Sequence, residues 1–147
     1  MKAVIQRVQS ASVFINKEPV SSISYGLLIY LGIEKNDTNK DINYLINKII
    51  NLRILKDNNN QMNLSVNNTN DEILVVSQFT LLANTKRGRR PSFENAETPE
   101  LAKLLYKEFY NQIKTKGLNV KKGRFGKNME IHAINDGPFT IVINSRI

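Results

Sequence analysis

The stretch "DEILVVSQFTLL" (residues 71–82) gives the strongest strand signal in the chain. Its centre, residues 73–76, is a run of Ile, Leu and two Val without a polar interruption. An alternating strand is covered on one face only, whereas an unbroken apolar run is typical of a strand that is buried on both faces. We therefore expect residues 71–82 to lie inside a sheet that helices cover.

Further strand signals lie on both sides of this stretch. "AVIQRVQSASVFI" (residues 3–15) is rich in β-branched residues, and "YGLLIYLGI" (residues 25–33) is typical of a buried strand. Shorter strands are predicted near residues 53–55, 118–120, 129–134 and 139–144. Between the last two stand Asn135, Asp136, Gly137 and Pro138, which favour a turn.

Two segments have the apolar spacing of helices. The first, within residues 36–55, has Asp37 or Thr38 as its predicted N-cap and this apolar stripe: Ile42, Leu45, Ile46, Ile49 and Ile50. The second begins with Thr98 as N-cap and Pro99 in the first turn and ends before Gly117. Its predicted buried stripe is Leu101, Leu104, Leu105, Phe109 and Ile113. The expected fold class is α+β: a mixed, strand-rich sheet or partial β-barrel covered by two helices, as one domain over residues 1–147.

The composition excludes several classes of protein and of active site. The chain has no cysteine, which leaves no disulfide, no thiolate nucleophile and no Cys-ligated metal. Residues 1–10 lack the apolar run of a signal peptide, and no apolar stretch approaches the ~20 residues that span a bilayer. We therefore expect a soluble, cytoplasmic protein without a membrane partner.

The net charge of +8 is concentrated in two glycine-containing stretches, "KRGRR" (residues 86–90) and "KKGRFGK" (residues 121–127). Stretches of this kind are often solvated loops. Two of them in one small domain favour a partner that carries phosphate groups.

Candidate catalytic residues are few. His132 is the only histidine and shares a strand face with Glu130 and Ile134, which favours a structural role. The other candidate is "SQFT" (residues 77–80), where polar residues end the apolar strand. If the strand continues, Ser77 and Phe79 lie on one face and Gln78 and Thr80 on the other. These residues either bond to neighbouring backbone at the strand end or form a site.

A family resemblance decides between these readings. "VSQFTLLANTKRGRRPSF" together with "NDGPFT" resembles the D-aminoacyl-tRNA deacylase family, whose hallmarks are an SQFT motif and an N-x-G-P-x-T motif. "MKAVIQRVQSASV", "GLLIYLGI" and "GRFGKNMEI" also match, so the likeness runs over essentially the whole chain. Phe139 stands where the family usually has valine, and Leu82 and Asn84 also depart from the usual residues.

The resemblance implies an activity and an assembly. Such a protein hydrolyses the ester that joins a D-amino acid to the 3′-terminal adenosine of tRNA, without a cofactor or metal. It is a homodimer, and each active site combines the SQFT strand of one subunit with a cis Gly137–Pro138 loop of the other. The carbonyls of that loop would face the aminoacyl group, exclude an L side chain and admit glycine.

Residue roles follow from the same resemblance. The family view makes Thr80 the nucleophile. Our own alternative is that the backbone amides of Phe79 and Thr80 bind the oxyanion while water, assisted by the ribose 2′-hydroxyl, attacks. Ser77 and Gln78 would fix the adenosine or the pocket wall, Phe79 would contact the terminal base, and Met129 would line the adenine pocket or belong to the core. The expected tRNA phosphate contacts are Lys86, Arg87, Arg89, Arg90, Lys121, Lys122 and Arg124.

Two other functions fit the sequence less well. Charge and size allow a non-catalytic RNA-binding module, although the chain lacks tryptophan and interleaved aromatic residues. A hydrolase of some other small ester or amide is a further alternative.

Overall fold

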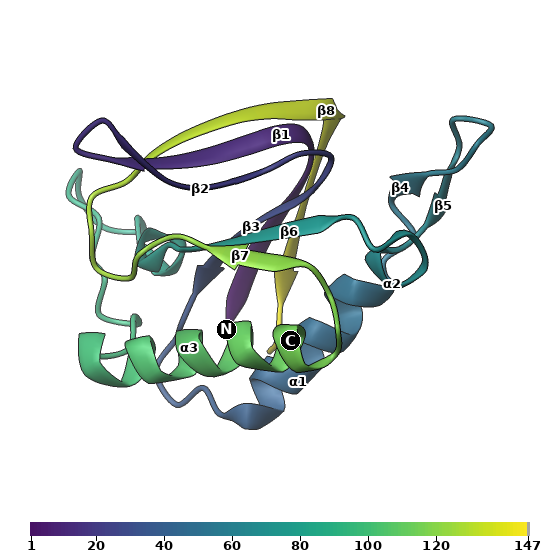
Figure 1. Cartoon of the computed structure of the whole chain (residues 1–147). Coiled ribbons are helices and arrows are strands. Elements are labelled where there is room, and N and C mark those ends of the chain that lie inside the picture. Colours follow the sequence, from purple (N-terminus) through teal and green to yellow (C-terminus); the bar gives the residue numbers. More distant parts are fainter. Residues whose placement is uncertain (147) are drawn as a thin grey trace.

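The computed structural model describes residues 1–146 as a curved, mixed sheet with helices packed below it (Figure 1). Six strands form the sheet: β1 (Lys2–Ile15), β2 (Glu18–Ile23), β3 (Gly26–Gly32), β6 (Glu72–Ser77), β7 (Val120–Lys122) and β8 (Glu130–Asn144). β1 pairs antiparallel with β2, β3 and β8, while β3, β6 and β7 run parallel to one another. A short hairpin of β4 (Leu55–Lys56) and β5 (Met62–Leu64) projects from one end (Figure 1).

The sheet is nearly closed into a barrel, because β2 and β7, the two strands at the ends of the order β2-β1-β3-β6-β7, lie close to each other. The hydroxyl of Ser21 donates to the carbonyl of Lys122 over 2.9 Å, and the amine of Lys121 donates to the carbonyl of Ser22 over 2.6 Å. The same Lys121 amine lies 3.0 Å from the Glu72 carboxylate on β6. Side chains, rather than a ladder of backbone hydrogen bonds, thus connect β2 and β7. The partial barrel predicted from the sequence is confirmed.

The prediction for residues 71–82 is half right. Ile73 and Val75 of β6 belong to the core between sheet and helices, whereas Leu74 and Val76 belong to a second apolar cluster on the opposite face. The strand is therefore buried on both faces, as the unbroken apolar run indicated. It ends at Ser77, however, and residues Phe79–Leu82 form a 3₁₀ helix, η1. The predicted alternation of faces across residues 77–80 is wrong.

Helices α1 (Asn39–Asn51) and α3 (Pro99–Thr115) cover one face of the sheet (Figure 1). Thr38 is the N-cap of α1, and its hydroxyl and the Asp41 carboxylate form a reciprocal capping box. All five predicted apolar residues of α1 are buried. A short third helix, α2 (Val66–Thr69), had no clear sequence signal.

The predicted buried face of α3 is partly wrong. Phe109 and Ile113 are buried, but Leu101 is 42% exposed and Leu104 is 63% exposed. The helix is rotated so that Ala102 and Tyr106 face the core, and the Tyr106 hydroxyl donates to the carbonyl of Val75 over 2.8 Å. This hydrogen bond satisfies a polar group inside the core, and burial raises the pKa of Tyr106.

The two strands predicted near residues 129–144 are one strand, β8. Both of its halves pair with β1, with Asn135 opposite Val8 and Thr140 opposite Gln6. Between these pairs, β1 has only Arg7 and β8 has residues 136–139. The Gly137–Pro138 segment therefore does not close a hairpin. It bulges out of a strand whose two arms remain in the same ladder.

No helix among residues 1–146 is both long and apolar enough to cross a membrane.

Candidate active site

A cavity of about 670 Å³ lies where β6 ends. Three segments line it: residues 76–79 at the end of β6, then Ala96, Glu97, Pro99 and Ala102 around the start of α3, and lastly residues 125–129 with Ile131 before and within β8. Four of the residues predicted to bind substrate are in this lining: Ser77, Gln78, Phe79 and Met129. The tertiary structure thus brings the SQFT segment and the "GRFGKNMEI" segment together.

The turn from strand to 3₁₀ helix shapes the floor of this cavity. The Gln78 amide still bonds to the carbonyl of Leu31 on the neighbouring strand β3 over 2.8 Å. The chain then bends into η1, which leaves the Phe79 side chain 58% exposed and in edge contact with the Phe93 ring at a centroid distance of 5.0 Å. An exposed aromatic ring at a cavity edge is available to stack on a ligand ring.

Among residues 1–146, the Thr80 hydroxyl has no hydrogen bond to a histidine, a lysine or a carboxylate. Its Oγ1 accepts a hydrogen bond from the Gln78 side-chain amide, which cannot remove a proton. His132 lies elsewhere: its Nε2 pairs with the Glu130 carboxylate, and its ring packs on Phe14. The structural role predicted for His132 is therefore supported.

Two backbone donors remain open beside the cavity. In residues 1–146 the N–H groups of Phe79 and Thr80 have no hydrogen-bond acceptor, whereas Gln78 N bonds to Leu31 and Leu81 N bonds to Gln78. The first N–H groups of any helix lack partners within the helix. Phe79 lines the cavity and Thr80 follows it in the chain, so these two N–H groups are candidates to bind a developing negative charge.

Gly137 and Pro138 lie outside this cavity. They are exposed on the bulge of β8, and neither belongs to the cavity lining. The peptide bond between them is cis, as the resemblance implied. Gly137 has φ of +136°, a conformation that side-chain-bearing residues rarely adopt.

A buried arginine holds this bulge in place. The Arg7 guanidinium donates to the Asp136 carboxylate over 3.0 Å and to the Asp136 carbonyl over 3.2 Å. It also donates to the carbonyl of Ile54 over 2.8 Å, and the Lys56 amine lies 3.1 Å from the same carboxylate. The hydrogen bond from Lys56 and the charge of Arg7 lower the pKa of Asp136, so this carboxyl stays ionised.

Sequence reasoning missed both Arg7 and Asp136. The available signal was a single arginine inside the apolar strand that starts the chain, since a charged residue there needs a buried partner.

Comparisons with known proteins identify the family of the chain. The family model described as D-Tyr-tRNA(Tyr) deacylase matches residues 4–144. The chain belongs to this deacylase family. A protein of Flavobacterium psychrophilum named D-aminoacyl-tRNA deacylase is 54% identical over 147 residues, covering 99% of this chain and 98% of that protein. A protein of the same name from Aquifex aeolicus is 52% identical, and the match covers 99% of each chain.

Solved structures extend the likeness to the fold. The structure titled "c-Myc DNA Unwinding Element Binding Protein" has a TM-score of 0.94 at 40% identity, with 100% of both chains covered. A probable eukaryotic D-amino acid tRNA deacylase has a TM-score of 0.83 over 97% of each chain; at 16% identity it shows the fold alone.

The residues that depart from the deacylase pattern have structural explanations. The Phe139 ring lies under the Arg7 guanidinium at 5.0 Å and packs against the main core. Its backbone N–H donates to the Asn135 side chain over 2.7 Å, so the larger residue is accommodated beside the bulge. Leu82 is buried. Asn84 pairs with Ser92 through two backbone hydrogen bonds and closes the loop that carries residues 86–90.

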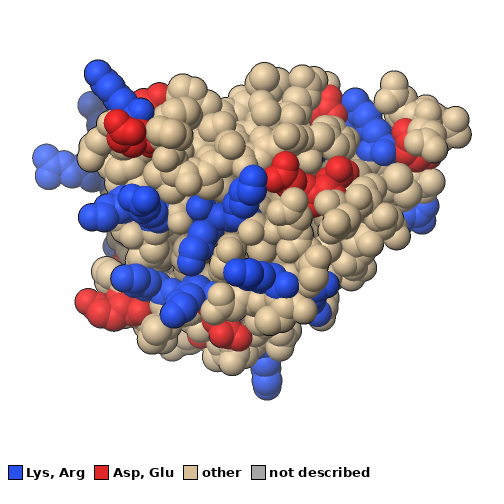
Figure 2. Space-filling view, in the orientation of Figure 1, with Lys and Arg blue, Asp and Glu red and all other residues tan. Residues whose placement is uncertain are grey.

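The basic residues expected to contact tRNA differ in whether their side chains are free to bind phosphate. Lys86, Arg87, Arg89, Arg90, Lys122 and Arg124 are exposed, and Figure 2 shows Lys and Arg side chains gathered over α3 and β7 and at the left edge of that view. Lys121 is instead engaged by Glu72 and Ser22. Its charge is already matched, which makes it a weak phosphate contact.

Most of the cavity lining was not predicted, including Glu97, Ala102, Phe125 and Lys127. Met129 occupies its place in the lining because Gly123 lies beneath it; a Cβ at Gly123 would lie 2.6 Å from the Met129 sulfur. The absence of a side chain at Gly123 therefore lets the thioether pack down beside the cavity.

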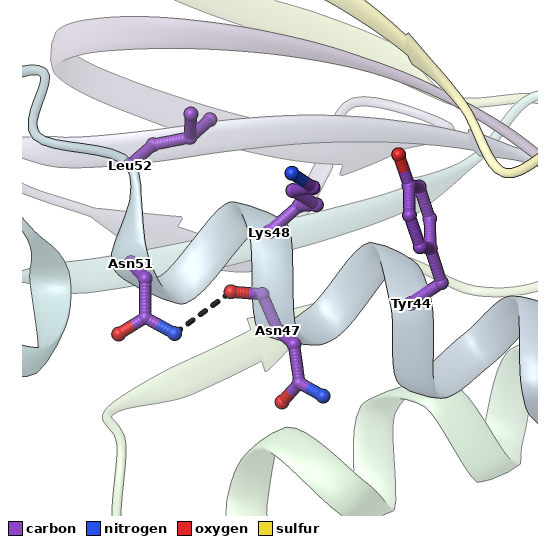
Figure 3. A pocket seen from close by; sticks show the side chains of 5 residues that line it. All are labelled: Tyr44, Asn47, Lys48, Asn51 and Leu52. Carbon is purple, nitrogen blue, oxygen red and sulfur yellow. Dashed lines mark hydrogen bonds between the residues drawn. The ribbon is translucent and has the colours of Figure 1, made fainter.

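A second hollow of about 520 Å³ lies along the outer side of α1 and is lined by Tyr44, Asn47, Lys48, Asn51 and Leu52 (Figure 3). The Asn51 amide donates back to the carbonyl of Asn47 over 2.8 Å. Asn47 and Asn51 are exposed amides and Lys48 is an exposed amine. These side chains offer neither a carboxylate nor an imidazole for acid–base chemistry, and we assign no activity to this hollow.

Proposed function

We propose that this chain is a D-aminoacyl-tRNA deacylase, which hydrolyses the ester between a D-amino acid and the 3′-terminal adenosine of tRNA. One observation carries the proposal. Within a chain that matches the deacylase family over residues 4–144, residues 77–79 of the SQFT segment line the cavity, next to the open backbone donors of Phe79 and Thr80. The proposed site of action is the cytoplasm, where aminoacyl-tRNA is used in translation.

The cavity suits a nucleoside in volume and lining. At about 670 Å³ it lies within the usual range of small-molecule sites. Phe79, Phe125 and Met129 offer apolar and aromatic surface to a base, and Ser77, Gln78 and Glu97 offer polar groups. We assign Ser77 and Gln78 to holding the adenosine and Phe79 to the base.

The proposed active site needs a second subunit, because the bulge of β8 lies outside the cavity of its own chain. Two features support a homodimer. β8 pairs only with β1 among residues 1–146, which leaves one edge of a long strand without a partner. Apolar side chains also stand on this strand in solvent: Ile134 is 56% exposed and Val142 is 68% exposed. A long free edge with apolar residues favours association.

In the proposed dimer, the partner subunit's Gly137 and the partner subunit's Pro138 enter the cavity opening. Their backbone carbonyls accept from the substrate α-amino group, and this fixes where the substituent on the α-carbon points. A D side chain points to solvent and an L side chain points into the loop, which rejects it by steric clash. Glycine has no Cβ and is accepted, so glycyl-tRNA is also a substrate.

The proposed reaction uses water as the nucleophile. Water adds to the ester carbonyl, and the N–H groups of Phe79 and Thr80 bind the negative oxygen of the tetrahedral intermediate. The bond from carbon to the ribose 3′-oxygen then breaks, and this oxygen takes a proton from the medium. An aminoacyl ester is already activated, so positioning and charge stabilisation suffice.

Thr80→Ala tests this assignment. We expect turnover of D-tyrosyl-tRNA to stay within about tenfold of wild type, because the backbone amides remain and the Thr80 hydroxyl has no adjacent base. Loss of a covalent nucleophile lowers kcat by several orders of magnitude. Single-turnover kinetics decide between the two, with Thr115→Ala as an exposed threonine control far along α3. Complete loss of chemistry with intact tRNA binding would assign the nucleophile role to Thr80.

The decisive experiment for the function is deacylation of matched D-tyrosyl- and L-tyrosyl-tRNA by purified protein. We expect rapid loss of the D-ester while the L-ester is spared. Hydrolysis of both esters would contradict the chiral role of the Gly137–Pro138 loop. Binding of tRNA without hydrolysis of either would favour the RNA-binding module instead, and hydrolysis of a free D-amino-acid ester alone would favour a small-ester hydrolase.

A further inference from the structure

A row of lysines on α3 begins beside the cavity and runs away from it. Lys103, Lys107 and Lys114 follow one face of the helix, with Tyr110 between them at the same spacing, and all three lysines are exposed. Pro99 and Ala102, which precede Lys103, line the cavity. From Lys103 to Lys114 the helix rises about 16 Å, at roughly 1.5 Å per residue.

Strand β7 adds a fourth amine to this row. The Lys122 amine lies 4.5 Å from the centre of the Tyr110 ring, and the Lys114 amine lies 6.0 Å from the same centre. The ring thus holds two cations near each other on the surface between α3 and β7. Figure 2 shows blue side chains gathered over this part of the molecule.

The charges of these four lysines are not matched by acids. Among residues 1–146, none of the four amines lies within salt-bridge distance of a carboxylate. Of the two acids on α3, Glu108 is engaged by the Gln112 amide over 2.8 Å, and Glu100 stands at the cavity end, three residues before Lys103. Like charges this close repel one another, so binding of a ligand of opposite charge is favourable at this surface.

We propose that Lys103, Lys107, Lys114 and Lys122 form a track that binds the phosphates of the double-helical stem leading to the 3′ end of the substrate tRNA. This assignment rests on the proposed function, since the cavity at the start of the track holds the terminal adenosine. A nucleic-acid strand carries a phosphate about every 3.4 Å of helix axis in B-DNA, so a track of this length faces several phosphates. Double-stranded RNA is recognised mostly by its shape and by phosphate contacts. The track therefore binds tRNAs whose stems differ in sequence with similar affinity.

The test compares two triple variants that remove the same charge. The track variant is Lys103→Gln, Lys107→Gln and Lys114→Gln. The control variant is Lys17→Gln, Lys40→Gln and Lys48→Gln, which changes exposed lysines outside α3 and β7. Lysine and glutamine have similar helix propensity, so α3 should keep its fold. Each variant is assayed on D-tyrosyl-tRNA and on the D-tyrosyl ester of adenosine, which has no stem.

We expect the track variant to lower kcat/KM for D-tyrosyl-tRNA by at least about tenfold near 0.1 M salt, through KM. The logarithmic salt dependence should become shallower by about one per lysine removed. Turnover of the adenosine ester should not change, and the control variant should match wild type on both substrates. Binding of uncharged tRNA, measured without catalysis, should weaken in parallel.

Three results would overturn the track. The track variant could match the control on tRNA, or it could lose activity equally on both substrates, which would mean that α3 merely shapes the cavity. An equal loss in both triple variants would mean that only net charge matters. A wild-type protein inert on both substrates would instead contradict the proposed function, and the binding of uncharged tRNA would still report on the track.

Discussion

Replacing Gly137 with alanine is expected to lower the deacylation rate of D-tyrosyl-tRNA by about 100-fold or more, because a catalytic surface that moves by about 1 Å loses that much. Gly137 has φ of +136°, where an L side chain is strained. Its new Cβ would lie 3.0 Å from the Phe139 backbone nitrogen and 3.2 Å from the Arg7 guanidinium. Both neighbours are fixed, by Asn135 and Asp136 respectively, so the loop itself must move.

The matched control is Gly117→Ala. Gly117 also has a positive φ, of +80°, but an added Cβ there meets nothing within 4 Å. It follows α3 and lies outside the cavity lining. In the control variant, alanine also has to adopt a positive φ, but its Cβ meets no neighbouring atom. We therefore expect near-normal activity and a slightly lower free energy of unfolding. Equal activity of the two alanine variants would contradict a catalytic role for the bulge.

The same variant tests whether the site crosses the subunits. Phe79→Pro removes one proposed oxyanion donor at the first position of η1, where proline fits a helix start. If Phe79→Pro and Gly137→Ala subunits exchange at equal amounts, half of the dimers are mixed, and each mixed dimer has one intact site. Activity should then recover to about a quarter of wild type. No recovery after verified exchange would place the loop and the cavity of one chain in the same site.

Arg7→Met is expected to lower the free energy of unfolding by about 3–5 kcal/mol, the usual effect of removing one partner of a buried ion pair. The Arg7 side chain is 5% exposed and that of Asp136 is 11% exposed, so among residues 1–146 the carboxylate would keep Lys56 alone as an ion-pair partner. The carbonyl of Ile54 would also lose its donor. Denaturant unfolding at one protein concentration measures the change, because association alters apparent stability.

Two further variants make this expectation specific. Arg53→Met removes an exposed arginine whose side chain, within the described residues, bonds to Asn63 alone, and it should change stability by less than about 1 kcal/mol. Asp136→Asn combined with Arg7→Met removes the uncompensated charge and should recover part of the loss. If Arg7→Met were no worse than Arg53→Met, the buried pair would not be what holds the bulge.

Local signals in the sequence were enough for much of the fold. The apolar run at residues 73–76 indicated a strand that is covered on both faces. The spacing from Ile42 to Ile50 indicated α1, and of the two predicted N-caps, Asp37 and Thr38, the structure has Thr38. These features depend on residues that are close together in the chain. The signals are the period of the hydrophobic residues, the helix-capping residues and the Gly and Pro residues that end an element. The motifs that resemble the deacylase family also lie in short segments, which is why they were readable without a structure.

The tertiary structure alone decided how these pieces meet. In α3, two apolar stripes share Phe109 and Ile113; the stripe with Ala102 and Tyr106 is buried because the Tyr106 hydroxyl finds the carbonyl of Val75 across the core. The Gly137–Pro138 segment became a bulge because both arms of β8 pair with β1. The cavity draws its lining from residues 76–131. A sequence determines local geometry through contacts between near neighbours. The rotation of α3, the bulge of β8 and the cavity lining instead depend on contacts between residues far apart in the chain. There a hydrogen bond or a complementary surface selects one of several arrangements that the local pattern allows equally.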